Sequence, residues 1–95
     1  MSPVQRIVAK FDVGRLYKTR GVAEQIHEDD IFDALVRHLN GDWGDVDKQD
    51  WQTNDEQLSR GGRLLSAYVD RRNTRFWIIT EADRSATTIL LPNEY

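Results

Sequence analysis

The side chains best suited to chemistry in this sequence are the arginines, histidines and carboxylates of its second half. Arg71, Arg72 and Arg75 fall within five residues, and such a cluster can bind phosphate or an acidic protein. If His38 or Glu81 transfers protons beside these arginines, the residues could form the active site of a small nuclease or toxin-like enzyme. The plainer interpretation is a charged hairpin tip, because charge at a sheet edge discourages unwanted strand pairing.

A second candidate site is the segment from Glu81 to Ser85, between two predicted strands. It offers two carboxylates, Glu81 and Asp83, followed by Arg84 and a hydroxyl, which suits a hydrolytic site. Asp and Ser are also favoured in turns because their side chains bond nearby backbone groups, and Glu81 and Arg84 can pair across the loop. We favour the turn.

The acidic stretch over residues 45–56 resembles a calcium loop only in part. Acids occupy positions 1, 3 and 12 of an EF-hand template, but Asp50 stands where glycine is required and Gln52 where an apolar residue is expected. A capped, solvated helix face accounts for the same acids. The sequence therefore predicts no metal site and no cofactor.

The two histidines are eleven residues apart, close to the three helical turns that would align them as an acid and base pair. A helix start at Asp29 and Asp30 would place His27 and His38 on different elements. His38 is better interpreted as a partly buried residue at a helix end, where positive charge is favourable. We predict no catalytic residue.

Two tryptophans are candidate contact residues. Trp43 lies in a turn of glycines and acids, where it either plugs the core or forms a hot-spot anchor at the surface. Trp77 lies in a run that is apolar at every position, and we count it as a binding residue of the predicted sheet.

Three segments have helical signals. Residues 29–39 repeat apolar side chains at helical spacing, with Asp29 and Asp30 as the N-cap and Gly41 as the C-terminal stop. Residues 47–60 form a weaker helix that ends at Gly61. Thr19 caps a short helix over residues 21–26, and residues 5–11 are a candidate N-terminal strand.

The last third of the chain predicts a three-stranded antiparallel meander over residues 63–69, 75–80 and 87–91. Its strands do not alternate apolar and polar residues, so both sheet faces need cover. Either the N-terminal segment or another protein molecule covers the second face. A homodimer or partner-binding face on the sheet is therefore as well supported as full cover within one chain. The expected fold class is α+β in one domain spanning residues 1–95. Two or three N-terminal helices pack on this meander, to which an N-terminal strand can be added.

Composition narrows the class of function. The net charge of −3 argues against general nucleic-acid binding, although residues 59–75 carry five arginines and residues 41–58 carry six acids. The chain has no cysteine, no apolar run of membrane-spanning length and no signal-peptide pattern. We therefore expect a cytoplasmic protein without membrane contact.

Several segments together form a pattern, namely Gly41-Asp-Trp-Gly-Asp45, Arg63-Leu-Leu-Ser-Ala-Tyr68 and residues 77–95. Through them the chain resembles a family of uncharacterised small bacterial proteins carried on plasmids, prophages and other mobile elements. The resemblance covers residues 11–95 and is strongest after Gly41. It implies an accessory role, such as host-defence evasion or regulation, and it brings no activity, cofactor or site residue.

The leading hypothesis is a small non-enzymatic protein-binding module whose partner is unknown. Its contacts would come from the apolar sheet face or the Trp43 loop. The alternative is the nuclease or toxin-like enzyme built on the arginine cluster. A third hypothesis is an acidic decoy that mimics nucleic acid through residues 42–56.

Overall fold

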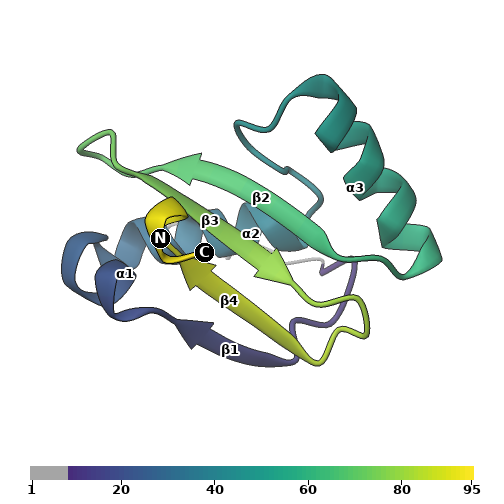
Figure 1. Ribbon diagram of the computed structural model, residues 1–95, viewed down its shortest axis with the longest axis horizontal. Helices are drawn as coiled ribbons and strands as arrows, with labels where there is room; N and C mark the ends of the chain where they lie inside the picture. The colour runs from purple at the N-terminus through teal and green to yellow at the C-terminus, as the bar shows by residue number, and fades with distance from the viewer. Residues whose placement is uncertain (1–8) are drawn as a thin grey trace, which may run out of the picture.

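The computed structural model describes residues 9–95, which fold into helices on one four-stranded sheet (Figure 1). The strand order in the sheet is β1-β4-β3-β2. No helix within this described part has the length and apolar character needed to cross a bilayer. The elements in chain order are β1 (Arg15–Lys18), α1 (Arg20–Gln25), α2 (Glu28–Leu39), α3 (Lys48–Arg60), β2 (Leu64–Val69), β3 (Arg75–Thr80), β4 (Ala86–Leu90) and the short 3-10 turn η1 (Pro92–Glu94).

The sheet confirms the predicted meander but adds a fourth strand in parallel. β2 pairs antiparallel with β3, and β3 with β4, whereas β1 runs parallel to β4. The prediction of a purely antiparallel sheet is therefore wrong. β1 has only four residues, too few for a strand period to be read from sequence. Positions 5–8 of the strand predicted at residues 5–11 lie outside the described residues, and Ala9–Phe11 are not in a strand.

The helices begin and end at residues that satisfy their free backbone groups. The Thr19 hydroxyl accepts a hydrogen bond from the Val22 N–H and caps α1, as predicted. α2 begins one residue earlier than expected, because the ring of His27 caps it and not Asp29 or Asp30. Those two acids lie in the first turn, where the helix dipole favours negative charge. Gly61 ends α3 with a left-handed φ of 87°.

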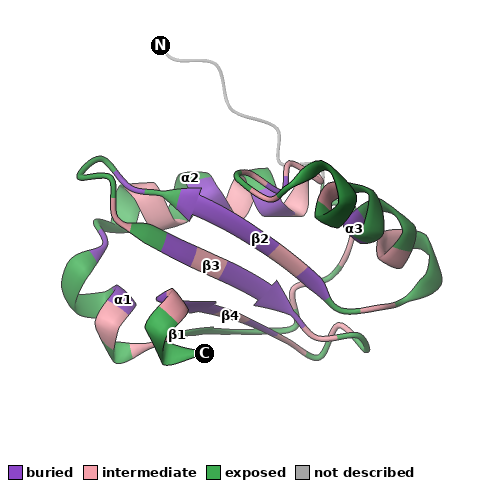
Figure 2. Ribbon diagram, turned by 45° about the horizontal axis from the view of Figure 1, so that its top comes forward, coloured by how far each residue is buried: buried purple, intermediate pink, exposed green. Residues whose placement is uncertain are grey.

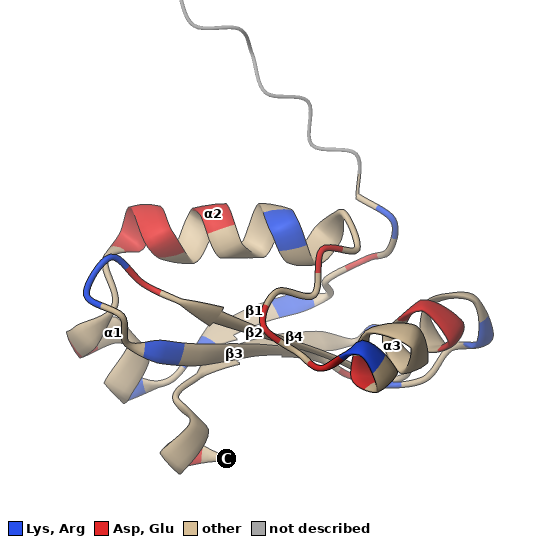
Figure 3. Ribbon diagram, turned by 90° about the horizontal axis from the view of Figure 1, so that it is seen from above, with Lys and Arg blue, Asp and Glu red and all other residues tan. Residues whose placement is uncertain are grey.

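One face of the sheet packs against α2, which lies across it as a separate layer (Figure 3). α1 adds Val22 and Ile26 at the end of this layer, and both are buried. Burial is concentrated in β2, β3 and β4, whereas β1 is exposed along its whole length (Figure 2). The apolar core on this side consists of Val22, Ile26, Ala34, Tyr68, Phe76, Ile78, Ile89 and Leu91.

The second face of the sheet is covered by the C-terminal end of the chain. The ring of Tyr95 packs edge-on against Trp77 at a centroid distance of 5.6 Å. Arg63 lies over the same tyrosine and donates a hydrogen bond to its hydroxyl at 2.7 Å. Ile79 and Leu90 are buried on this side, and Trp77 is half-buried. Among the described residues this face is thus covered by η1 and Tyr95, although Tyr95 is itself 68% exposed, and not by the N-terminal segment as expected. The homodimer through the sheet stays a prediction.

Two sets of hydrogen bonds pair the backbone groups on the outer edge of β2. The Asp45 N–H donates to the Ala67 carbonyl at 2.7 Å, and the Ala67 N–H donates to the Trp43 carbonyl at 3.1 Å. Further along, the Asn54 carboxamide imitates a strand, because it donates to the Leu65 carbonyl at 2.7 Å and accepts from the Leu65 N–H at 3.2 Å. Backbone groups that would otherwise remain free on this edge are thus paired.

We expect Asn54→Ala to destabilise the protein by about 1–3 kcal/mol, because it leaves the Leu65 N–H and carbonyl without partners beside α3. Asn54 is only 5% exposed, so water does not easily replace the lost carboxamide. Urea denaturation followed by circular dichroism measures the change. Thr53→Ala, one position earlier and exposed, is the matched control. Equal urea midpoints for the two variants would show that the carboxamide does not stabilise this edge.

Candidate functional site

Trp43 plugs the core and is not a surface anchor. Its side chain is fully buried, and its indole N–H donates to the Asp55 carboxylate at 2.9 Å. The indole stacks on Phe11 at a centroid distance of 6.3 Å and meets His38 edge-on at 5.5 Å. The contact role suggested for Trp43 by its place in a polar turn is therefore wrong, because no part of the ring is open to a partner.

His38 lies at the centre of a buried chain of hydrogen bonds. Its Nδ1 is 2.5 Å from the Ser66 hydroxyl, and its Nε2 is 2.8 Å from the Thr80 hydroxyl. The Thr80 hydroxyl is 2.8 Å from that of Thr87, which in turn donates to the Val13 carbonyl at 2.8 Å. All four side chains are fully buried. This series of hydrogen bonds links α2, β2, β3, β4 and the segment before β1.

A serine beside a histidine is the arrangement of an activated nucleophile, but this pair has no access for a substrate. Burial, with a smaller contribution from the charge of Arg84, lowers the pKa of His38 to about 3. The ring is therefore neutral, and its two nitrogens are both satisfied by hydroxyls. The expectation of a partly buried, charge-favoured helix-end residue is wrong, since His38 is a neutral residue of the core.

The three arginines of the predicted cluster differ in their contacts: Arg71 forms an ion pair within the chain, and the other two are exposed. Arg71 holds Asp30 through its Nε and Nη2, each 3.0 Å from a carboxylate oxygen, and through its backbone N–H. These bonds lower the pKa of Asp30 to about 2. Arg72 and Arg75 are exposed. The cluster is therefore not a set of three free cations.

The proposed nuclease groups are not assembled at one place. Arg75 is the first residue of β3 and Glu81 follows its last, which separates them by about 20 Å along the strand. His38, the other proton carrier considered, is buried. Among residues 9–95, no group of three or more His, Asp or Glu side chains is placed to hold a metal ion. The geometry gives no support to the nuclease alternative.

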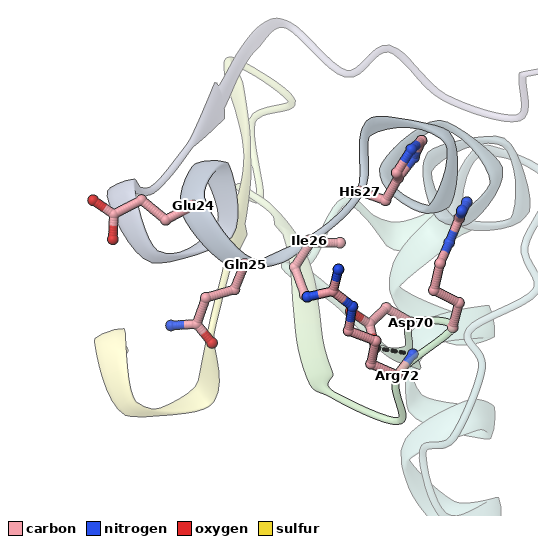
Figure 4. A pocket seen from close by; sticks show the side chains of 7 residues that line it. Glu24, Gln25, Ile26, His27, Asp70 and Arg72 are labelled. Atoms are coloured by element: carbon pink, nitrogen blue, oxygen red, sulfur yellow. Dashed lines mark hydrogen bonds between the residues drawn. The ribbon is translucent and has the colours of Figure 1, made fainter.

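A pocket of about 220 Å³ lies beside the arginine hairpin, between the α1–α2 junction and the β2–β3 turn (Figure 4). Its lining includes two acids, Glu24 and Asp70, as well as Arg71 and Arg72, so its charge is balanced. The Asp70 carboxylate already accepts the backbone N–H groups of Arg72 and Thr74 at 2.9 and 2.7 Å. This arrangement is a closed turn and not a phosphate site.

The segment from Glu81 to Ser85 is a turn that is fastened to α3. The Asp83 carboxylate accepts the Ser85 N–H at 2.9 Å, as turn residues do. The Arg84 guanidinium donates to the carbonyls of Gly62 and Gln57, at 2.6 and 3.0 Å, where α3 ends. Arg84 also contacts the Glu81 carbonyl, whereas the Glu81 carboxylate lies 3.8 Å from Arg63. The predicted Glu81–Arg84 side-chain pair does not form.

Several of the acids over residues 42–56 have structural roles. Asp42 pairs with Arg37 at 2.8 Å, and this bond lowers the pKa of its carboxyl group. Asp47 caps α3, and Asp55 holds the indole of Trp43. An acidic decoy would need carboxylates free to imitate phosphates, and these three are engaged.

The candidate surface that remains lies at β1. Leu16 and Tyr17 are 49% and 50% exposed, and Phe32 on α2 is 54% exposed. A shallow groove of about 290 Å³ lies between β1 and α2, and we call it the β1 groove; it is lined by Leu16, Tyr17, Lys18, Ile31 and Ile89. Exposed apolar side chains that border a groove are typical of surfaces that bind proteins.

None of these β1 residues was selected from the sequence. The available signal was weak: an apolar pair, Leu16 and Tyr17, lies between Arg15 and Lys18. Phe32 was assigned to the apolar stripe of the helix, yet Ile31 and Phe32 are neighbours and differ by about 100° around a helix, so only one can face the core directly. Ile31 packs against the core and Phe32 does not.

We expect the free energy of unfolding to decrease as the pH falls below about 6.5. The unfolded state binds a proton on His38 near pH 6.5, while the folded state resists protonation down to about pH 3. Between these values the contribution of His38 is a loss of up to about 1.4 kcal/mol per pH unit. Urea denaturation at a series of pH values measures it. His38→Gln should flatten this slope, and Thr53→Ala, an exposed change without a titrating group, should not. Identical slopes for the three proteins would show that His38 is not shielded.

We also expect the Asp30–Arg71 pair to stabilise the fold in a defined pH range. The folded-state pKa of about 2 lies below the usual 3.8, so the contribution is complete above pH 3.8 and disappears as the pH falls through about 2. Asp30→Asn should lower the urea midpoint at pH 7 and have a much smaller effect near pH 2, where about half of the folded-state Asp30 carboxyl groups are protonated. Asp33→Asn, an exposed change on the same helix, is the control. An effect of Asp30→Asn that is as large at pH 2 as at pH 7 would contradict the role of the charge.

The candidate catalytic side chains are thus engaged within the fold or lie far apart. Exposed apolar side chains border the groove at β1, and Val69 and Tyr95 are exposed elsewhere. Comparisons of the chain with protein-family models, with curated proteins and with solved structures found no match. The function of this chain must therefore be argued from its own surface.

Proposed function

We propose that this chain is a non-enzymatic protein-binding module that uses the β1 groove as its contact surface. The observation that carries the proposal is the β1 groove itself, which is lined by half-exposed Leu16 and Tyr17, with half-exposed Phe32 one position along α2 from the lining residue Ile31. Exposed apolar side chains beside an apolar groove are typical of surfaces that bind another molecule.

The state of the polar side chains supports a binding role over a catalytic one. His38 and Ser66 have no exposed surface, and Arg71 is occupied by Asp30. The β1 groove itself is lined by four apolar or aromatic residues and one lysine. It offers packing surface for a partner's side chains and no set of groups suited to acid–base or nucleophilic chemistry.

The proposal extends to an accessory role for a mobile genetic element, in host-defence evasion or regulation, with the protein acting in the cytoplasm. The support for this setting is the sequence resemblance over residues 11–95 and the lack of cysteine. Within the proposal the partner is a different protein. Self-association with a second copy of this chain is the alternative, and a measurement of molar mass by sedimentation distinguishes the two.

A random peptide library displayed on phage tests the binding role while the partner is still unidentified. We expect the full-length chain to select peptides, and Leu16→Ser combined with Phe32→Ser to reduce their affinity at least about tenfold. This corresponds to about 1.4 kcal/mol, a modest loss for two apolar contacts. Both residues are half exposed, so the variant should keep its free energy of unfolding within about 0.5 kcal/mol of the parent.

Val69→Ser is the matched control, because Val69 is 42% exposed but belongs to β2, at the other side of the sheet. It should leave peptide affinity unchanged. Failure to select any peptide, or an equal loss of affinity in both variants, would rule out the β1 groove as a protein-binding surface.

A further inference from the structure

The β1 groove is bordered by a strand edge whose backbone groups point outward. The Arg15 N–H donates to the Ser85 carbonyl at 2.9 Å, and the Thr19 N–H donates to the Ile89 carbonyl at 3.0 Å. Because alternate residues of an edge strand face opposite sides, the N–H and carbonyl groups of Leu16 and Lys18 point away from β4. Within residues 9–95, no segment pairs with this outer edge of β1.

The two edges of the sheet are treated differently by the fold. On β2, the bridge at Ala67 and the carboxamide of Asn54 pair the outward backbone groups. On β1, the outward groups lie beside two half-exposed apolar side chains and the β1 groove. A free edge next to an apolar groove is the geometry that receives an added strand, in which backbone bonds provide affinity and alternate side chains provide specificity.

The charge around β1 indicates which kind of strand can bind. Residues 9–20 contain four basic residues and one acid in a chain whose net charge is −3, and one of the four, Arg20, is paired with Glu24 at 3.0 Å. The one acid, Asp12, has its carboxylate occupied by the Gly14 N–H at 2.9 Å. Two of the basic residues, Arg15 and Lys18, are the ends of β1 itself. A short strand with charged ends resists pairing with a similar strand and attracts an acidic one.

We propose that the β1 edge accepts an extended acidic segment of a partner protein as an added strand. This inference rests on the proposed protein-binding function and defines its partner. Apolar side chains at every second position of the segment would pack into the β1 groove beside Leu16 and Ile31. Carboxylates at the alternate positions would lie on the opposite face, beside Arg15, while Lys18, which shares the groove face with Leu16, would lie over the end of the segment. The backbone of the segment would bond the outward groups of Leu16 and Lys18.

A second copy of this chain fits the same edge poorly. Two β1 strands side by side would bring two Arg15 and two Lys18 side chains within the length of one four-residue strand. Like charges across a strand pair are destabilising.

A seven-residue synthetic peptide of alternating valine and glutamate tests this inference on the full-length chain. Two matched peptides carry glutamine or lysine in place of glutamate. We expect the glutamate peptide to bind about tenfold more tightly than the glutamine peptide, because the exposed charges of Arg15 and Lys18 each contribute modestly, and we expect no binding of the lysine peptide. Arg15→Gln combined with Lys18→Gln should remove the preference for glutamate.

Amide hydrogen exchange measured by NMR reports strand addition directly. Bound glutamate peptide should slow exchange at the N–H groups of Leu16 and Lys18. It should leave Tyr17 unchanged, because that N–H already faces β4. A peptide that merely lies on the apolar surface would not produce this alternation. Protection at none of these amides, or equal affinity of the glutamate and glutamine peptides, would overturn the inference.

The outcomes separate this inference from the proposed function. If library peptides bind through Leu16 and Phe32 but show neither a glutamate preference nor alternating protection, the binding module stands and the acidic strand is excluded. If no peptide of any composition binds, both fail. A chain that sediments as a dimer, with Leu16 and Lys18 protected in the absence of peptide, would assign the edge to a second copy and overturn the acidic-partner proposal.

Discussion

His38 connects five segments of this chain through hydrogen bonds at a site with no exposed surface. Its ring nitrogens meet hydroxyls from β2 and β3, and the bonds continue through Thr87 on β4 to the Val13 carbonyl just before β1. A buried polar group destabilises the fold unless its donors and acceptors are paired. The hydrogen bonds of His38 can all form only when α2 and the strands lie in one register. Phe11 and Trp43 seal the same site with aromatic contacts.

The position of α2 in turn determines which surfaces are left open. Once α2 lies over β2, β3 and β4, its Ile31 side reaches only partly over β1, and a groove remains there. The opposite face receives η1 and Tyr95, and the β2 edge receives Asn54 and the segment around Gly44. The β1 edge is left with exposed Leu16 and Tyr17. The proposed binding surface is therefore a consequence of how few residues are available to cover a four-stranded sheet.

Local signals predicted the local structure well. The boundaries of β3, the Thr19 cap, the Asp47 start of α3 and its end at Gly61 all follow from residue types next to one another in the chain. The same signals gave a poor account of the candidate site. The residues around Trp43 in sequence leave a core plug and a surface anchor equally open, and a helix-end position predicts only partial burial for His38. In space the neighbours of these two rings are Phe11, Asp55 and the strands. Burial depends on contacts distant in sequence, which neighbouring residue types do not report.

Residue types close together in the chain predict the helices and the three strands of the meander, because caps, turns and apolar repeats act over four or five residues, and they require both faces of the meander to be covered. The existence and pairing of β1, the segments that cover the sheet, and the charges left unpaired depend on the packing of the whole fold. The parallel pairing of Arg15 with Ala86 joins residues 71 positions apart, and the Asp30–Arg71 pair joins residues 41 positions apart. Such contacts form only when the whole core packs, since their energy depends on geometry that no short segment holds alone.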